Sequence, residues 1–474
     1  MEVLQRTANR GSVSTGDYEI DNSIKFETAN TESLTKSQTA SNRKTWTLSF
    51  WFKRTKVDTD LQYTFQANVS SSTVFDIVLN GITDWRISDY TSGSRSLAFY
   101  STVPLRDASA WYHLVVACDT TQSTEANRFK IYLNGVQVDT ISGYFSTAQY
   151  PAEDYETNIN NSAATLSIGK SISASTNFCG YIAEVNFIDG LMKDEEDFGK
   201  FDSNSGIWQP IEYTGSYGNE GYYLDFADSG DLGDDESGNG KDFTENNITA
   251  ADQATDTPTN NFCTWSPLWA ESRANGTITE GATQVAWGGG AWKIARSSMA
   301  VSKGRWYWEI KGANVTGDTW NNNLFGFASV EGQNGQYGPT VLIGYSTGNY
   351  YYRVDNSQTG DSSTGWDSGG AWSSSDTFGF ALDLESSTKK FILYRNGSAV
   401  NGSGTDLVSA FQTEQFFTPY ATSYNGDTQF LNWGGYTVNT ISSAATDANG
   451  YGTFEYAPPS GYYALCTKNL AEYG

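Results

Sequence analysis

The sequence predicts an all-β protein built from two β-sandwiches in tandem. Apolar and polar residues alternate over short runs, Asn-Gly hairpin markers lie inside such runs, and no long segment has the spacing of an amphipathic helix. The composition agrees, because 47 Gly and 29 Tyr among 474 residues, with only 18% charged residues, are typical of strands joined by polar turns.

The strands of the first half follow a polar arm at residues 1–22 and continue to about residue 200. Thr45–Lys53 (TWTLSFWFK) has an apolar residue at every second position, which predicts a strand with one buried face. Trp111–Cys118 is an almost continuous apolar run and predicts a central strand. Asn134-Gly135 predicts a hairpin, because a type I′ turn needs positive φ at both positions. Further short strands are predicted at Val74–Leu79, Asp84–Ile87, Leu166–Gly169 and Tyr181–Ile188.

The second half is predicted to begin after a connector. Residues 201–265 are acidic and rich in Gly, and residues 266–440 again show strand patterns, with a hairpin marker at Asn396-Gly397. Residues 441–474 form a C-terminal segment. IYLNGVQV in the first half and ILYRNGSAV in the second are similar, which favours two related sandwiches, at 23–200 and 266–440.

The charge balance excludes some partners. Lys and Arg total 29 against 54 Asp and Glu, a formal net charge of -25, which disfavours nucleic acid and anionic lipid and favours a neutral or cation-bridged ligand. No apolar run approaches 18 residues, so no membrane insertion is expected. The N-terminus lacks an apolar run of the kind found in signal peptides.

Histidine and cysteine are scarce. The chain has one histidine, His113, inside an apolar strand, where a structural role is expected. Cys118 and Cys179 could pair within the first half, and Cys263 and Cys466 within the second, but reduced and buried thiols are favoured.

The catalytic patterns in the sequence are incomplete, so the chain is predicted not to be an enzyme. GYSTG at Gly344–Gly348 matches G-x-S-x-G, but that motif needs a following helix and a nearby histidine, so a strand-loop-strand is expected. Glu184 and Asp189 are five residues apart and should point to opposite faces of a strand. Asp383 and Glu385 share a face but stand alone before a turn.

The acidic stretch DSGDLGDDESGNGKD is a candidate Ca²⁺ site. Carboxylates and carbonyls are the ligands that Ca²⁺ prefers, although the order of residues is not that of an EF-hand. A solvated acidic loop is the alternative. The candidate ligands are Asp228, Asp231, Asp234 and Asp235.

Aromatic residues in polar, Asn- and Gly-rich segments of the second half are candidate ligand-binding residues. Exposed aromatic side chains are frequent binding hot spots. The alternative is that they belong to the core or to a subunit contact. The candidates are Trp320, Tyr337, Tyr350, Trp366 and Trp372.

Both halves resemble known families. TWTLSFWFKR, AWYHLVVACD, FKIYLNGVQVD and LSIGK followed by CGYIAEVNFIDG resemble, in order, the strands of laminin G-like, concanavalin-type sandwiches. GRWYWEIKG, LFGFASVEG, DTFGFALDLESSTKKFILYRNG and TPYATSYNGDTQFLNWG resemble a SPRY domain. The resemblance implies two tandem concanavalin A-like (jelly-roll) β-sandwiches with a loop-rich connector. It also implies binding through loops at one end of the second sandwich.

The connecting segments GIWQPIEYTGSYGNEGYYLDF, TPTNNFCTWSPL and PPSGYYALCTKNL resemble those of marine bacteriophage structural and tail-fibre-like proteins. This implies a virion protein assembled in the host cytoplasm, as a tail fibre, spike or capsid appendage. The expected partners are other virion proteins, further copies of the chain, and host-surface polysaccharide. A purely structural capsid decoration protein is the main alternative, and a glycan depolymerase is the third.

Overall fold

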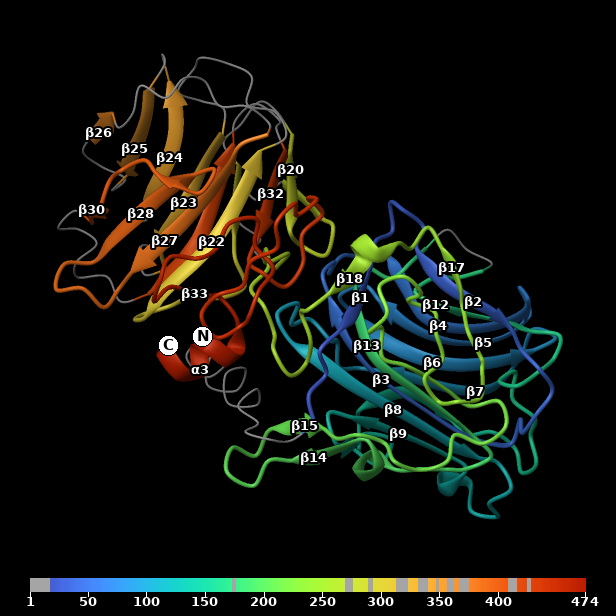
Figure 1. Cartoon of the computed structure of the whole chain (residues 1–474). Helices are drawn as coiled ribbons and strands as arrows, with labels where there is room; N and C mark the ends of the chain where they lie inside the picture. Colours follow the sequence, from blue (N-terminus) through green and yellow to red (C-terminus); the bar gives the residue numbers. More distant parts are fainter. Residues whose placement is uncertain are drawn as a thin grey trace. The chain divides into compact units, whose positions relative to one another are not determined.

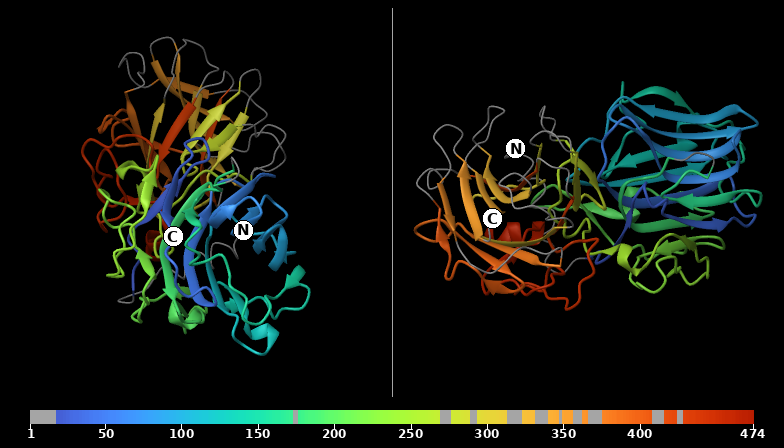
Figure 2. Two further views of the ribbon diagram at one scale, coloured as in Figure 1. Left: turned by 90° about the vertical axis from the view of Figure 1, so that its right-hand side faces the viewer. Right: turned by 90° about the horizontal axis from the view of Figure 1, so that it is seen from above.

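The computed structural model forms two compact units, which meet in the sequence between Asn260 and Asn261. Each unit contains layered β-sheets, and the fold is nearly all-β, as predicted (Figures 1 and 2). The structure describes residues 18–172, 176–268, 276–288, 293–312, 323–330, 340–346, 349–355, 362–365, 375–407, 416–423 and 428–474.

The first unit is a sandwich of two eight-stranded sheets. In spatial order, sheet A consists of β10 (Val136–Gln137), β9 (Phe129–Leu133), β8 (Trp111–Asp119), β3 (Thr45–Arg54), β13 (Gly180–Asp189), β1 (Ser23–Phe26) and β18 (Gln253–Ala254), with β16 (Tyr222–Leu224) also paired to β13. Sheet B consists of β11 (Phe145–Gln149), β7 (Ser94–Ser101), β6 (Asp84–Thr91), β5 (Thr73–Asn80), β4 (Leu61–Ser70), β12 (Thr165–Ile168), β2 (Ser33–Ser37) and β17 (Thr244–Asn246). A short hairpin joins β14 (Gly199–Phe201) to β15 (Trp208–Pro210).

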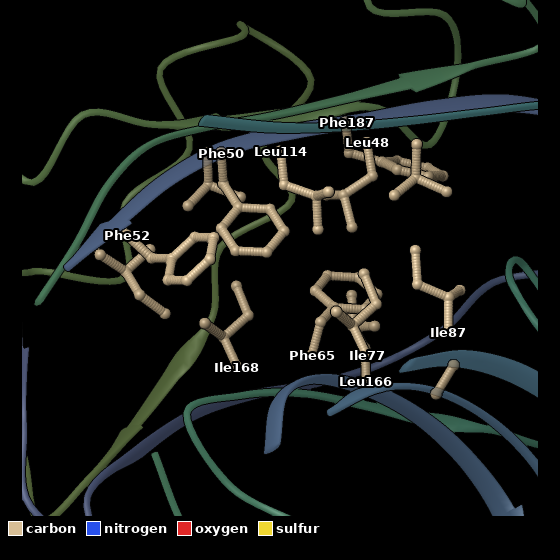
Figure 3. Packing of buried hydrophobic residues seen from close by; sticks show 14 of the residues in the cluster. Leu48, Phe50, Phe52, Phe65, Ile77, Ile87, Leu114, Leu166, Ile168 and Phe187 are labelled. Carbon is tan, nitrogen blue, oxygen red and sulfur yellow. The ribbon is translucent and has the colours of Figure 1, made fainter. Parts of the chain in front are cut away.

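The core of the first unit lies between the two sheets. Leu48, Phe50 and Phe52 of β3 point from sheet A towards Phe65 and Ile77 of sheet B (Figure 3). All five side chains are almost fully buried, which confirms the predicted apolar face of Thr45–Lys53; the opposite face of β3 is buried too, contrary to the expectation of one buried face. Burying a side chain of this size contributes about 1.5–3 kcal/mol to folding, before the entropy cost of ordering the chain.

The hairpin turns follow the predicted chemistry. Asn134 and Gly135 have φ of 49° and 76° and connect β9 to β10. Asn396 and Gly397 have φ of 48° and 76° in the second unit. Both positions of each turn are therefore left-handed, as a type I′ hairpin requires.

The segment predicted as a connector is part of the first sandwich up to Asn260. Its strands β16, β17 and β18 pair with β13, β2 and β1 respectively. Leu232, Phe243 and Ile248 of this segment belong to the buried core cluster. Alternation alone does not reveal these strands, because each has only two or three residues.

The second unit is also a sandwich. Its nine-stranded sheet consists of β19 (Gly276–Thr279), β20 (Gln284–Trp287), β32 (Thr428–Asn432), β22 (Arg305–Gly312), β27 (Thr377–Asp383), β28 (Lys390–Arg395) and β29 (Ser398–Ala399), with β30 (Thr405–Asp406) on β28 and β33 (Tyr463–Ala464) on β22. Its six-stranded sheet consists of β21 (Lys293–Arg296), β31 (Phe417–Ser423), β23 (Asn323–Ser329), β24 (Thr340–Ser346), β25 (Asn349–Asp355) and β26 (Ser362–Gly365).

The C-terminal segment packs against the nine-stranded sheet of the second sandwich. β33 runs parallel to β22, and Leu470 packs into the same core cluster as Trp306 and Trp308. In the described part of the chain, no helix is both long and apolar enough to cross a membrane. The described helices are η1 (Glu125–Asn127), η2 (Glu195–Asp197), η3 (Ala250–Asp252) and α3 (Thr467–Tyr473).

Candidate functional site

The outer face of sheet B carries polar and aromatic side chains. The antiparallel register places Gln66, Asp76, Ser88 and Ala98 side by side across β4, β5, β6 and β7. These positions alternate with the core residues of the same strands, so they lie on the face away from the core. This row forms a floor of mostly short side chains across the middle of the sheet.

Two β-bulges bring further residues to this outer face. The register of β4 with β5 shifts between Tyr63 and Phe65. Tyr63 therefore pairs with Val78 and lies on the outer face, whereas Phe65 lies in the core. The register of β6 with β7 shifts after Asp89, so that Arg95 pairs with Tyr90. Strict alternation would have put Tyr63 and Arg95 on the core face.

Tyrosine and arginine side chains flank the floor on both sides. The hydroxyls of Tyr90 and Tyr100 are 2.9 Å apart, and either can be the donor. The Arg95 guanidinium lies 5.0 Å from the ring centre of Tyr100 and 5.7 Å from that of Tyr90. The Arg86 guanidinium lies 5.5 Å from the Tyr100 ring. We call this group the Tyr–Arg face; it comprises Tyr63, Asp76, Arg86, Ser88, Tyr90, Arg95 and Tyr100.

The Tyr–Arg face remains accessible above its buried floor. Arg95 is exposed and Tyr90 and Tyr100 are half-buried, whereas Ser88 is buried. Asp76 accepts a 2.5 Å hydrogen bond from the Ser88 hydroxyl. Burial raises the pKa of the Asp76 carboxyl to about 6, against the opposing effects of Ser88 and Arg86. Aromatic rings with guanidinium and hydroxyl donors close to them can hold a polar ligand that also has apolar faces.

The outer face of sheet A is covered instead. Trp51, His113 and Val115 lie on it, and residues 198–217 pack over them. Trp51 stacks on His113 with ring centres 4.5 Å apart. Trp208 donates a 2.9 Å hydrogen bond from Nε1 to His113 Nδ1.

His113 is locked in one neutral form. Indole Nε1–H can only donate, so His113 Nδ1 accepts and Nε2 carries the proton. Nε2 then donates to Ser49 Oγ, 2.8 Å away. Burial lowers the pKa of the imidazole to about 3. The single histidine is therefore structural, as predicted.

The candidate carboxylate pair Glu184 and Asp189 is separated. Glu184 has φ of 56° at a bulge in β13 and accepts hydrogen bonds from Tyr18 and Tyr223 at 2.7 and 3.0 Å. Burial raises the pKa of its carboxyl to about 7. Asp189 instead accepts from Ser41 at 2.5 Å. The two carboxylates therefore serve different networks.

The acidic stretch is organised by its own turns. Asp228 accepts from the N–H of Gly230, and Asp231 from that of Gly233. Asp235 is buried and accepts four hydrogen bonds, from the N–H groups of Tyr223, Ser237 and Lys241 and from the Ser237 hydroxyl. Within the described ranges, no three His, Cys, Asp or Glu side chains gather in a metal-binding arrangement. The structure therefore does not bring Asp228, Asp231, Asp234 and Asp235 together as Ca²⁺ ligands.

The predicted aromatic residues of the second half fall mostly outside the described residues. This applies to Trp320, Tyr337, Trp366 and Trp372, and only Tyr350 has a described position, in β25 opposite Tyr345. The loop site stays a prediction.

The G-x-S-x-G match and the cysteines lie where the sequence predicts. Ser346 ends β24 and pairs with Asn349 at the start of β25, so the motif lies at the junction of two antiparallel strands, as expected, and its last two residues are outside the described ones. All four cysteines are free and buried, in agreement with reduced thiols.

The Tyr–Arg face was missed by the sequence analysis. The alternation in DWRISDYT could have found Arg86 and Tyr90 as outward residues of one strand. Tyr63 and Arg95 could not have been found in this way, because bulges decide their side.

Comparisons with known proteins agree with the fold. Residues 26–196 match the laminin G family described as the Concanavalin A-like lectin/glucanases superfamily. A search of the curated proteins finds no match.

Several solved structures are similar at low identity. The SPRY domain of human HERC1 is 14% identical, with a TM-score of 0.26, and the match covers 34% of this chain and 95% of that one. Domains LG4-5 of the mouse laminin α1 chain are 10% identical over 88% of this chain and 90% of theirs, with a TM-score of 0.28. The CBM40 of Ruminococcus gnavus sialidase, solved with α2,3-sialyllactose, is 13% identical over 39% and 96%, with a TM-score of 0.26. These likenesses carry no conclusion about function. The match of residues 26–196 and the sheets described above make the first unit a laminin G-like, concanavalin A-like domain.

Proposed function

We propose that this chain is a non-enzymatic recognition protein that binds polysaccharide through the Tyr–Arg face of its first sandwich. The observation behind the proposal is the pair of half-buried rings of Tyr90 and Tyr100, joined through their hydroxyls beside two guanidinium groups. Sugar rings have apolar C–H faces and polar edges, and the Tyr–Arg face offers a complement to both.

The arrangement favours binding over hydrolysis. Glycosidases use two carboxyl groups about 5–9.5 Å apart, one as acid and the other as base or nucleophile. The Tyr–Arg face has one carboxyl group, Asp76, and Ser88 is hydrogen-bonded to it. A surface of this kind can hold a sugar but lacks the second group that cleavage needs.

A role within a phage particle, as tail fibre, spike or capsid appendage, is the second part of the proposal. Its support is the resemblance of the connecting segments to marine bacteriophage structural proteins. In this setting, the Tyr–Arg face would contact host-surface polysaccharide. An antibody against the chain should decorate the tail or the capsid surface of intact particles in electron micrographs, and particles without label would contradict a virion role.

The binding proposal is tested with the full chain and a panel of neutral and acidic polysaccharides. The double variant Tyr90→Ala/Tyr100→Ala should lose at least about tenfold in affinity, since aromatic hot spots commonly contribute 2 kcal/mol or more. Phe201→Ala is the matched control, because Phe201 is 51% exposed and lies on β14, away from sheet B. If no polysaccharide binds, or if both variants bind like the wild type, the proposal is wrong. A capsid decoration protein would bind assembled shells and no polysaccharide.

A further inference from the structure

We infer that the ligand of the Tyr–Arg face is an anionic polysaccharide, whose carboxylate or sulfate groups are held by Arg86 and Arg95. This inference rests on the proposed function and adds the chemical class of the ligand. It differs from the expectation drawn from net charge, which favours a neutral or cation-bridged ligand.

The first argument is the absence of an ion-pair partner. The chain has 54 Asp and Glu for 29 Lys and Arg, so a cation should readily find a carboxylate. In the first sandwich, Lys25 contacts Glu32 and Asp252, and Lys53 contacts Asp256, all at 2.7–2.8 Å. Among the described residues, Arg86 and Arg95 have no carboxylate oxygen within 4.0 Å of a guanidinium nitrogen. The two cations are therefore available to an external anion.

The second argument is the position of the guanidinium groups. Both lie over the Tyr100 ring, at 5.5 and 5.0 Å from its centre, so the two cations converge on one tyrosine. A guanidinium group has five N–H donors in a planar fork that matches a carboxylate or sulfate in bidentate geometry.

The third argument is a buried donor without an acceptor. Arg86 Nε is shielded from water and, in the described part of the chain, has no hydrogen-bond partner. Leaving such a donor unsatisfied costs free energy, so Arg86 loses no hydrogen bond at Nε when its side chain turns towards a ligand. Asp76 does not fill this role, since neither of its carboxylate oxygens accepts a hydrogen bond from Arg86 Nε. The Tyr–Arg face thus has two cations and one anion, within a chain whose formal net charge is -25.

The test compares three polymers with one backbone: dextran, carboxymethyl-dextran and dextran sulfate. The full chain should bind at least one charged polymer about tenfold more tightly than dextran, and this preference should weaken as salt rises from 0.05 to about 0.5 M. Binding to carboxymethyl-dextran alone would assign carboxylate as the ligand group, and binding to dextran sulfate alone would assign sulfate.

The variant for this test is Arg86→Gln/Arg95→Gln, with Lys200→Gln as the matched control. Lys200 is an exposed cation on β14, so its loss changes net charge without changing the Tyr–Arg face. The double variant should lose about tenfold in affinity for the charged polymer, while the control keeps it. The affinity of Arg86→Lys/Arg95→Lys should lie between those of the glutamine double variant and the control, because lysine keeps the charge and loses the bidentate fork. Thermal melting of each variant checks that it is folded.

Two outcomes separate this inference from the proposed function. If neutral and charged polymers bind equally, or if the arginine double variant binds like the wild type, the inference is wrong. The proposed function still stands in that case, provided that Tyr90→Ala/Tyr100→Ala abolishes binding. If neither the three polymers nor the wider panel binds, both are wrong.

Discussion

Both outer faces of the first sandwich carry aromatic side chains, but another segment of the chain covers only that of sheet A. Sheet A carries Trp51 and His113 on its outer face, and sheet B carries Tyr90 and Tyr100. On sheet A, the segment 198–217 packs over the aromatic residues, and His113 becomes 1% exposed. On sheet B, the tyrosines stay half-buried and Arg95 stays exposed.

An aromatic outer face is therefore not by itself a binding site. On sheet A the aromatic residues hold a returning segment in place, and their polar atoms bond to one another, as in the pair of Trp208 and His113. On sheet B, by our proposal, the guanidinium groups of Arg86 and Arg95 hold a ligand. Substitutions on sheet A should therefore change stability, and those on sheet B should change binding.

The largest expected effect is that of Trp208→Ala on stability. The indole is 9% exposed, and Gly135 and Gly199 leave the space that its ring occupies. The free energy of unfolding should fall by about 3–5 kcal/mol, as for other buried Trp and Phe truncations. Urea denaturation measures this, with Leu191→Ala, at a side chain that is 45% exposed, as the control. A loss below about 1 kcal/mol would mean that the segment does not hold the sheet.

Protonation of His113, on the outer face of sheet A, should lower the free energy of unfolding at low pH. The pKa of His113 is about 3 in the folded chain and 6.5 in the unfolded chain, so the unfolded state binds the extra proton between these values. The contribution of the neutral His113 imidazole to stability is complete above pH 6.5 and falls by about 1.4 kcal/mol per pH unit below pH 6.5. The stability gap between wild type and His113→Gln should therefore narrow from pH 6.5 to pH 4. A gap independent of pH would contradict the buried neutral imidazole.

Sheet B should show the opposite pH dependence at Asp76. Burial raises the pKa of this carboxyl to about 6 from 3.8, so the folded state binds an extra proton between these values, and its stability falls as pH rises from 3.8 to about 6. Asp76→Asn should be more stable than wild type at pH 8, by up to about 3 kcal/mol, and equal to it near pH 4. Melting curves at the two pH values test this, and the same gain at both would rule out titration as the cause.

The smallest effect is expected from Tyr100→Phe. The change removes only the hydroxyl that meets Tyr90, and it keeps the ring under Arg86 and Arg95. Stability should change by no more than about 1 kcal/mol, and polymer affinity by less than about threefold. Isothermal titration measures the affinity. A loss as large as that of Tyr90→Ala/Tyr100→Ala would show that the hydroxyl, rather than the ring, holds the ligand.

The sequence alone predicted the sandwiches well and the site poorly. The strands at Thr45–Lys53 and Trp111–Cys118 and the two Asn-Gly hairpins follow from local patterns that need no tertiary contact. The segment 201–260 was expected to be a loop-rich connector, yet it supplies β16, β17 and β18. These strands form because β13, β2 and β1 offer them backbone groups to pair with, and their own residues carry little pattern.

Alternation of apolar residues and the chemistry of the turns were enough to determine the all-β class, the two Asn-Gly hairpins and the buried side chains of β3. The tertiary structure decided which polar side chains meet. Tyr63 and Arg95 reach the outer face of sheet B only because bulges shift the register of β4 and β7. A bulge is stabilised by the pairing of two strands, so one strand read by itself does not contain it. A second tertiary effect separates His113, which is buried and hydrogen-bonded, from Tyr100, which lies half-buried at the surface. What decides the role of each is whether another part of the chain covers that face.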